Sequence, residues 1–168
     1  MQHRIGLNCG RMVTGNMGSE MRMNYTMMGD TVNLAARLES SAKQYGVYNF
    51  VGENIYEAAK THFAFRFLDF VKVKGKNIPV KVYELVSDKN EILSENIDLI
   101  KLFEQGIDHY FKQEWKMAVN KFKQAENLED KFESRNTTPS QIYIERCEMF
   151  MKNPPEKDWD GVWKMTSK

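Results

Sequence analysis

The sequence has few cysteines and no long apolar run. Its two cysteines among 168 residues, Cys9 and Cys147, stand far apart and lack the paired CxxC spacing. This pattern argues against a disulfide framework or a structural zinc site and favours a reducing compartment. No apolar stretch is long enough to cross a bilayer, and the chain does not open with an apolar secretion signal. We therefore expect a cytoplasmic chain, although the parent protein could carry a membrane anchor upstream.

The sequence also lacks a strong excess of either charge. Lysine and arginine total 24 against 23 aspartate and glutamate residues, for a formal net charge of +1. Such a balance provides no broad electrostatic attraction to nucleic acid, so we expect no nucleic-acid partner. The histidines, His3, His62 and His109, are scattered without the spacing of metal ligands. Hydrophobic residues make up 42% of the whole chain, which is enough for a folded core.

The most informative stretch is NYTMMGDTVNLAARLESSAKQYG, residues 24–46. Gly29 and Asp30 combine a chain breaker with a helix-capping residue, and apolar residues then recur at helical spacing to the end of the stretch. Asn33 and Arg37 are four residues apart, so they lie one turn apart on the face opposite the apolar residues. An amide and a guanidinium in this arrangement can bind one anion, but the same spacing is also typical of an ordinary solvated face.

The string YTMMGDTVNLAARLE, preceded by GNMGS, resembles the central signature of class III nucleotide cyclases. These enzymes make cyclic AMP or cyclic GMP from the nucleoside triphosphate. The similarity continues through KVKGK to about Val86, or roughly half of the chain. The resemblance implies the C-terminal half of a cyclase catalytic domain. The first half of that domain, which carries two metal-binding aspartates and a lysine that reads adenine, has no counterpart in this sequence.

The resemblance gives roles to particular residues. It implies that Asn33 orients the ribose and that Arg37 stabilises the charged phosphate as the ribose hydroxyl attacks. Thr26 falls where the family reads the purine, and Lys74 falls where a lysine holds the terminal phosphates, with Lys76 as the alternative. Arginine suits phosphoryl oxygens because its planar fork of donors stays charged and can bind two oxygens at once. Since the nucleophile belongs to the substrate, such a site needs orientation and charge stabilisation but no protein nucleophile.

The resemblance further implies an adenylate cyclase that converts ATP into cyclic AMP and pyrophosphate, with Mg or Mn as the cofactor of the intact enzyme. We expect no metal ligands in this chain and therefore no activity of the fragment alone. In the family the active site lies between two protomers, which implies a homodimer through the cyclase domain. Thr26 favours adenine, with guanylate cyclase as an alternative. The other alternative is a non-catalytic cyclase fold that serves as a dimerisation and partner-binding module.

Strands and helices alternate along residues 1–86, which predicts an α+β fold, the C-terminal half of a ferredoxin-like cyclase domain. We expect a strand over residues 4–13 and a hairpin turn from Gly15 to Gly18. Six methionines gather between residues 12 and 28. They favour either a flexible partner surface or plain core and edge packing.

Residues 87–95, SDKNEILSE, are mostly charged or polar and predict a linker to a second unit, residues 96–168, with a tryptophan-containing tail. Two helical patterns in this unit resemble a tetratricopeptide (TPR) repeat, a small all-α helical hairpin. The positions that match the repeat are Gly106, Ala118, Phe122 and Ala125. A single repeat is too short for a free-standing solenoid, so we expect this extension to dock on the cyclase half or to bind a protein partner.

Overall fold

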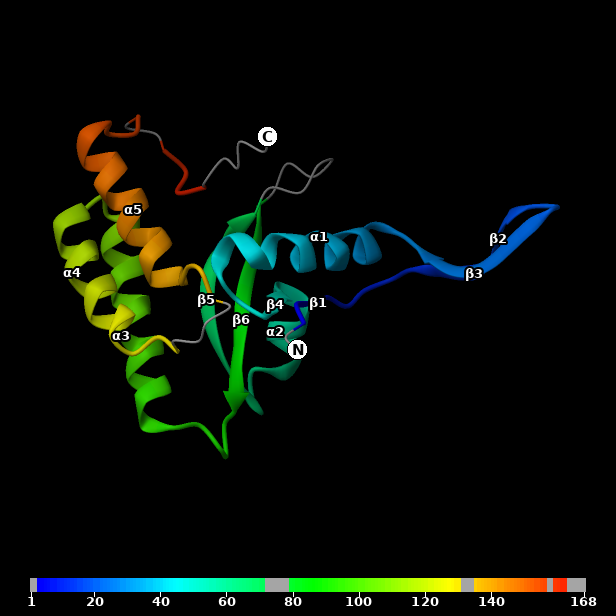
Figure 1. Ribbon diagram of the computed structural model, residues 1–168, viewed down its shortest axis with the longest axis horizontal. Coiled ribbons are helices and arrows are strands. Elements are labelled where there is room, and N and C mark those ends of the chain that lie inside the picture. The colour runs from blue at the N-terminus through cyan, green and yellow to red at the C-terminus, as the bar shows by residue number, and fades with distance from the viewer. Residues whose placement is uncertain (1–2, 72–78, 131–134, 157–158, 163–168) are drawn as a thin grey trace.

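The computed structural model describes residues 3–71, 79–130, 135–156 and 159–162. Figure 1 shows a central sheet with helix α1 along one side, helices α3–α5 at one end, and a long hairpin arm at the opposite end. The elements in chain order are β1 (Ile5–Leu7), β2 (Val13–Ser19), β3 (Arg22–Met28), α1 (Asp30–Tyr45), β4 (Asn49–Gly52), α2 (Glu53–Ala59), β5 (Phe63–Val71), β6 (Val80–Asp88), α3 (Ser94–Phe111), α4 (Trp115–Glu126) and α5 (Pro139–Lys152).

The central sheet has four strands in the order β1-β4-β6-β5. β1 pairs with β4 in parallel, whereas β4 and β5 each pair with β6 in the antiparallel direction. This mixed sheet with helices at its end confirms the predicted α+β class. In the described part of the chain, no helix has an apolar stretch long enough to span a membrane.

Helix α1 packs on β1 and β4 through one apolar stripe. The buried side chains of that stripe are Leu34, Leu38, Ala42 and Tyr45. The helix ends at Gly46, which adopts the left-handed conformation with φ 64° that a residue without a Cβ reaches at little cost. The expected capping by Asp30 is wrong, because the N-cap is Gly29 and no side chain caps the helix. Asp30 instead lies in the first turn, where a carboxylate favours the positive end of the helix dipole.

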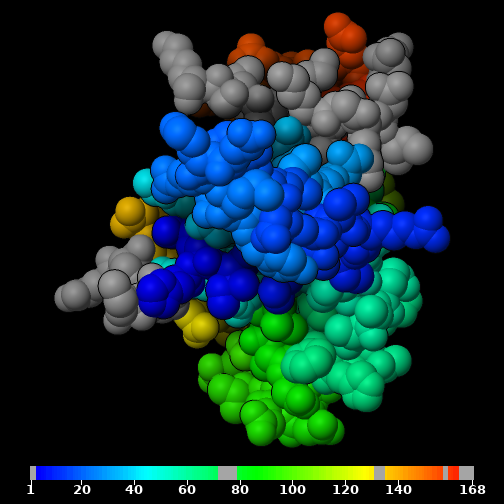
Figure 2. Space-filling view, turned by 90° about the vertical axis from the view of Figure 1, so that its right-hand side faces the viewer, coloured from blue at the N-terminus to red at the C-terminus, as the bar shows by residue number. Residues whose placement is uncertain are grey.

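The hairpin arm of β2 and β3 differs from the prediction. β1 ends at Leu7 and the next strand begins at Val13, so the single strand expected over residues 4–13 is wrong. The arm then projects from the body, and Figure 2 shows it from its own end. Its large apolar side chains are solvent-exposed except for the half-buried Met17, and Met21 at the tip is 97% exposed. The methionine cluster is therefore not core packing within this chain.

The turn of the arm lies at residues 20–21, where Ser19 faces Arg22 across the hairpin. The turn expected from Gly15 to Gly18 is therefore wrong, and both glycines lie within β2. Gly18 has φ 150°, and a Cβ there would lie 2.0 Å from the carbonyl oxygen of Arg22. The glycine is needed because the facing strand approaches closely, and not because the chain reverses at that point.

One hydrophobic core continues from α1 and the sheet into helices α3–α5. Leu38, Phe50 and Leu68 belong to it on the sheet side, and Phe103 and Phe122 belong to it on the helical side. β6 extends to Asp88 and α3 begins at Ser94, so only a short segment joins the two parts. The domain boundary expected at residues 87–95 stays a prediction, but the helical extension docks on the sheet and α1.

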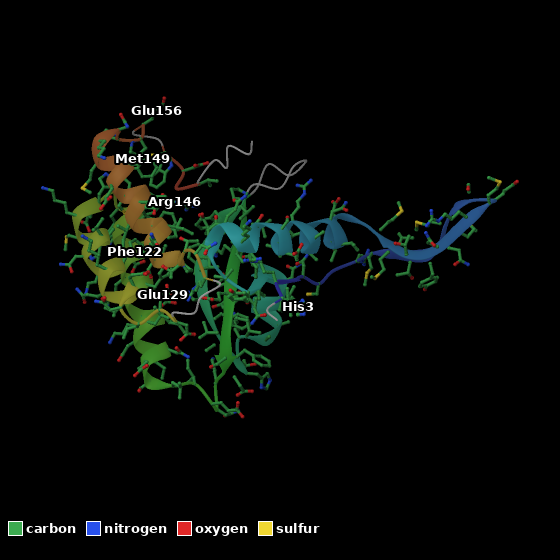
Figure 3. All side chains as sticks on the ribbon, viewed as in Figure 1. His3, Phe122, Glu129, Arg146, Met149 and Glu156 are labelled. Atoms are coloured by element: carbon green, nitrogen blue, oxygen red, sulfur yellow. The ribbon has the colours of Figure 1, made fainter. Side chains whose placement is uncertain are left out.

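Buried charges join the helical extension to the sheet. Arg66 of β5 is 1% exposed and donates to Glu84 of β6 at 2.5 Å and to Glu129, which follows α4, at 2.6 Å. Glu129 also accepts hydrogen bonds from Ser140 at 2.8 Å and from Arg135 at 3.1 Å. Figure 3 marks Glu129 on the helical side of the molecule, at the end opposite the arm. Buried charges are tolerated only when paired and hydrogen-bonded, so these contacts hold the two parts in one arrangement.

Candidate functional site

Asn33 and Arg37 lie on the solvent-facing side of helix α1. Both residues are exposed, while Leu34 and Leu38 beside them in sequence are buried against the sheet. Within the described residues, neither side chain forms a hydrogen bond or an ion pair. The hydroxyl of Ser40 donates to the backbone carbonyl of Arg37 and does not involve its guanidinium. An amide and a guanidinium one turn apart are therefore available to a ligand on this face.

Thr26 lies on β3 of the arm, opposite Gly15 in the hairpin register, and is exposed. β3 leads through Gly29 directly into α1, so two consecutive elements carry Thr26, Asn33 and Arg37. Lys74 and Lys76 lie outside the described residues, so the structure does not place the predicted phosphate lysine.

The acidic residues of α1 do not form a metal site. Asp30 and Glu39 are nine residues apart, which places them on opposite sides of the helix and more than two turns apart along it. Among the described residues, no group of three or more histidine, cysteine, aspartate or glutamate side chains is arranged to hold a metal ion. The described residues therefore do not fit the divalent metal that the sequence resemblance implies, and we assign them no step through it.

The buried side of α1 ends in a polar cluster that the sequence analysis missed. The Tyr45 hydroxyl donates to Oδ2 of Asp69 on β5 at 2.7 Å, and the same oxygen accepts a bond from Arg146 of α5 at 2.6 Å. Burial, together with the Asp69 carboxylate, raises the pKa of Tyr45 above its ordinary value, so the phenol stays protonated and acts as a donor. A signal was present, because Arg66 and Asp69 interrupt the otherwise apolar run FAFRFLDFV.

Two hollows lie on other surfaces of the molecule. One, of about 330 Å³, lies between Tyr56 of α2, Tyr83 of β6 and Phe111 of α3. Burial raises the pKa of Tyr83 to about 12. The other, of about 360 Å³, is lined by aromatic and isoleucine side chains together with Lys60 and Lys89. Neither hollow, as far as its described lining goes, contains Thr26, Asn33 or Arg37.

The chain is similar in sequence to a known protein family and to several characterised proteins. Residues 1–87 match the family described as the adenylate and guanylate cyclase catalytic domain. The chain is 32% identical over 149 residues to the "Adenylate cyclase, terminal-differentiation specific" of Dictyostelium discoideum, an alignment that covers 85% of this chain and 7% of that protein. It is 39% identical over 83 residues to "Adenylate cyclase 1" of Rhizobium meliloti, covering 49% of this chain and 12% of that protein.

Among solved structures, the chain is similar to the adenylyl cyclase CyaB from P. aeruginosa, with 32% sequence identity and a TM-score of 0.45 over 54% of this chain and 45% of that one. The Dictyostelium alignment is too long to be confined to residues 1–87, so it also takes in part of the helical extension. The chain spans only a small part of the two curated relatives. Because the family match covers more than half of its 168 residues, this chain belongs to the class III adenylate and guanylate cyclase family, with a helical region after the cyclase segment.

Proposed function

We propose that this chain is a fragment of a class III adenylate cyclase that contains the C-terminal half of the catalytic domain, and that its α1 face binds the ribose and phosphates of ATP. The observation that carries the proposal is the exposed pair of Asn33 and Arg37, one helical turn apart and without a side-chain partner among the described residues. Two observations support the proposal: α1 lies within the segment that matches the cyclase family, and the pair is exposed on it.

In the proposed reaction the ribose hydroxyl gives up its proton to solvent and its oxygen attacks the α-phosphorus of ATP. A new ester bond closes the ring, and the bond to the leaving pyrophosphate breaks. Asn33 orients the ribose through its amide, so that the hydroxyl is aligned with the phosphorus. Arg37 stabilises the negative charge on the phosphoryl oxygens as the reaction proceeds. Neither side chain forms a covalent intermediate, since the nucleophile is part of the substrate.

Substrate choice is assigned to Thr26. Its hydroxyl offers one donor and two acceptor sites to a purine edge and leaves room for the base. In family terms a threonine at this position goes with adenine, so we propose ATP in preference to GTP. Lys74 remains the proposed ligand of the terminal phosphates, with Lys76 as the alternative.

We also propose that the intact protein is a symmetric homodimer through the cyclase domain, with active sites at the seam. The exposed arm supports this assembly, because large apolar side chains on a projecting hairpin are typical of a surface that a partner covers. The exposed side chains of the arm and its base are Met12, Val13, Met21, Met23, Tyr25, Met27 and Met28.

We infer further that α3 and α4 are one TPR-like helical hairpin. All the positions that match the repeat are buried. Gly106 of α3 lies against the Phe122 ring of α4, so that a Cβ on Gly106 would lie 2.6 Å from Cε1 of Phe122. A small residue of one helix that receives an aromatic ring of the next supports this assignment.

The experiment is a nucleotide-conversion assay of the intact protein that carries this chain, with ATP and GTP measured in parallel in the presence of manganese. Arg37→Ala should lower kcat by about 10³-fold and change KM much less, because the guanidinium acts on charge that develops in the transition state. Lys43→Ala is the matched control, since Lys43 is another exposed cation of α1 at a different angle around the helix. It should retain the wild-type kcat.

The assay can contradict the proposal in three ways. Equal rates for the wild-type protein and Arg37→Ala would remove the role of Arg37. A higher kcat/KM with GTP than with ATP would favour the guanylate cyclase alternative. If neither nucleotide is converted, the result would favour the alternative function, a non-catalytic module for dimerisation and partner binding.

A further inference from the structure

The C-terminal end of α1 is held by the helical extension through the side chain of its last residue. Tyr45 is 1% exposed, and its hydroxyl donates to Asp69 at 2.7 Å. Arg146 of α5 donates to the same Asp69 oxygen at 2.6 Å and to the Tyr45 hydroxyl at 3.4 Å. The guanidinium also lies over the Tyr45 ring, 5.6 Å from its centroid. The extension therefore contacts α1 both directly and through β5.

A second contact holds the backbone just beyond the helix. The carbonyl oxygen of Gly46 accepts a hydrogen bond from Nε of Arg135 at 2.9 Å. The carbonyl oxygen of Thr137 lies so close that a Cβ on Gly46 would be only 1.9 Å away. Arg135 is itself fixed by Glu129 at 3.1 Å. Residues 135–137, between α4 and α5, thus enclose the helix end.

These contacts act on the same rigid element that carries the candidate site. With a rise of about 1.5 Å per residue, Arg37 lies about 12 Å and Asn33 about 18 Å from Tyr45 along the helix axis. A helix transmits a tilt of one end to the other. Because a displacement of about 1 Å can reduce turnover about 100-fold, the orientation of α1 matters to a reaction that depends on alignment.

We propose that the helical extension positions the candidate active site through an α1 clamp, made of Arg146, Asp69 and Tyr45 together with Arg135 and Gly46. The inference rests on the proposed cyclase function and extends it to a region beyond the family match. Arg146, Tyr45 and Arg135 are positioning residues, because they lie at the C-terminal end of α1 and act on Asn33 and Arg37 only through the helix. A change in the packing of α5 would alter turnover without altering any residue that touches the substrate.

Two tyrosines provide a matched test of positioning against plain stability. Tyr45 of α1 and Tyr143 of α5 are both buried, and each donates one hydroxyl hydrogen bond to β5. The Tyr143 bond goes to the carbonyl oxygen of Leu68 at 2.6 Å and involves no atom of α1. Tyr45→Phe therefore loosens α1, whereas Tyr143→Phe removes a similar bond between α5 and the sheet. Arg146 still neutralises Asp69 in the Tyr45→Phe variant, so both variants should fold.

The first measurement is hydrogen exchange of the α1 amides of residues 33–41 in the present chain, alongside urea unfolding of both variants. Tyr45→Phe should accelerate exchange in this segment at least about fivefold beyond what its global stability accounts for, because it removes the short buried hydrogen bond to Asp69 and the longer one from Arg146. Tyr143→Phe should show no such local effect. Equal acceleration in both variants, or none in Tyr45→Phe, would overturn the clamp whether or not the protein is a cyclase.

The second measurement is kcat and KM of the intact protein. Tyr45→Phe should lower kcat by roughly 10- to 100-fold with little change in KM, and Tyr143→Phe should retain the wild-type kcat. Faster exchange in α1 with an unchanged kcat would overturn the positioning role while leaving the proposed cyclase in place. A wild-type protein without activity would instead defeat the proposed function, and the exchange data would then decide the clamp by themselves.

Discussion

The replacement Glu129→Gln tests how strongly the buried charges hold the helical extension to the sheet. Glu129 is 4% exposed and accepts hydrogen bonds from Arg66 at 2.6 and 3.2 Å, from Ser140 at 2.8 Å and from Arg135 at 3.1 Å. A glutamine removes the negative charge and turns an amide donor toward guanidinium donors. Arg66 keeps its ion pair with Glu84. The cations Arg66 and Arg135 are then left with Glu84 as their one acidic partner within these ion pairs.

The magnitude follows from the burial of the pair. Removing one partner of a buried ion pair costs about 3–5 kcal/mol, and we expect a loss of unfolding free energy of about 3 kcal/mol, at the low end, because Glu84 still pairs with Arg66. Urea unfolding at pH 7 measures this loss. The control is Glu57→Gln, which breaks an exposed pair with Lys60 and should leave the unfolding free energy unchanged. A loss below about 1 kcal/mol for Glu129→Gln would refute the argument that these charges hold the two parts together.

The same replacement has a defined pH dependence. Burial alone would raise the pKa of Glu129, but the charge of Arg66 and its hydrogen bonds, with Arg135 and Ser140, lower it below the ordinary value of 4.5. A carboxylate with a lowered pKa adds stability above its unfolded-state pKa, and this stability is lost as the pH falls through the lower folded-state value. The difference in unfolding free energy between wild type and Glu129→Gln should therefore be constant near neutrality and shrink below about pH 4.5. A difference that grows toward acid pH would contradict this sign.

Two further predictions concern glycines. Gly106→Ala should lower the unfolding free energy by about 1–2 kcal/mol, because a Cβ 2.6 Å from the Phe122 ring overpacks the α3–α4 contact by more than the helix gains from alanine. Gly15→Ala, where nothing lies within 4 Å of the new Cβ, is its control and should be nearly neutral in the same urea experiment. Gly46→Ala should cost more than about 2 kcal/mol, since it combines a left-handed φ of 64° with a Cβ 1.9 Å from the Thr137 carbonyl oxygen. A melting temperature equal to that of the wild type would show that residues 135–137 do not enclose the end of α1.

The sequence predicted the elements whose residues follow one dominant pattern. The helix of Asn33 and Arg37 was predictable because Leu34, Leu38 and Ala42 recur at helical spacing and Gly46 ends the run. The exposure of the pair followed from the same periodicity, since residues between the buried positions must face away from the sheet.

What the sequence could not predict depends on contacts between distant residues. Gly15 and Gly18 indicated a turn, but the chain reverses at residues 20–21, because the register of an antiparallel pair is set by both strands and not by the glycines of one. Likewise, Arg66 and Asp69 find their partners Glu129 and Arg146 more than 60 residues later, so local pattern could not place them in the core.

The buried charges between sheet and helices constrain how such a chain can change over evolution. The exchange of the helical segment for a foreign one, at a crossover between β6 and α3, would leave Arg66 without Glu129 and Asp69 without Arg146 in the interior. In such a chimera Arg66 would keep only Glu84, and the Asp69 carboxylate would lie in the interior without a cation. We therefore expect the cyclase segment and its C-terminal helices to be inherited together and to diverge through compensating substitutions at these pairs.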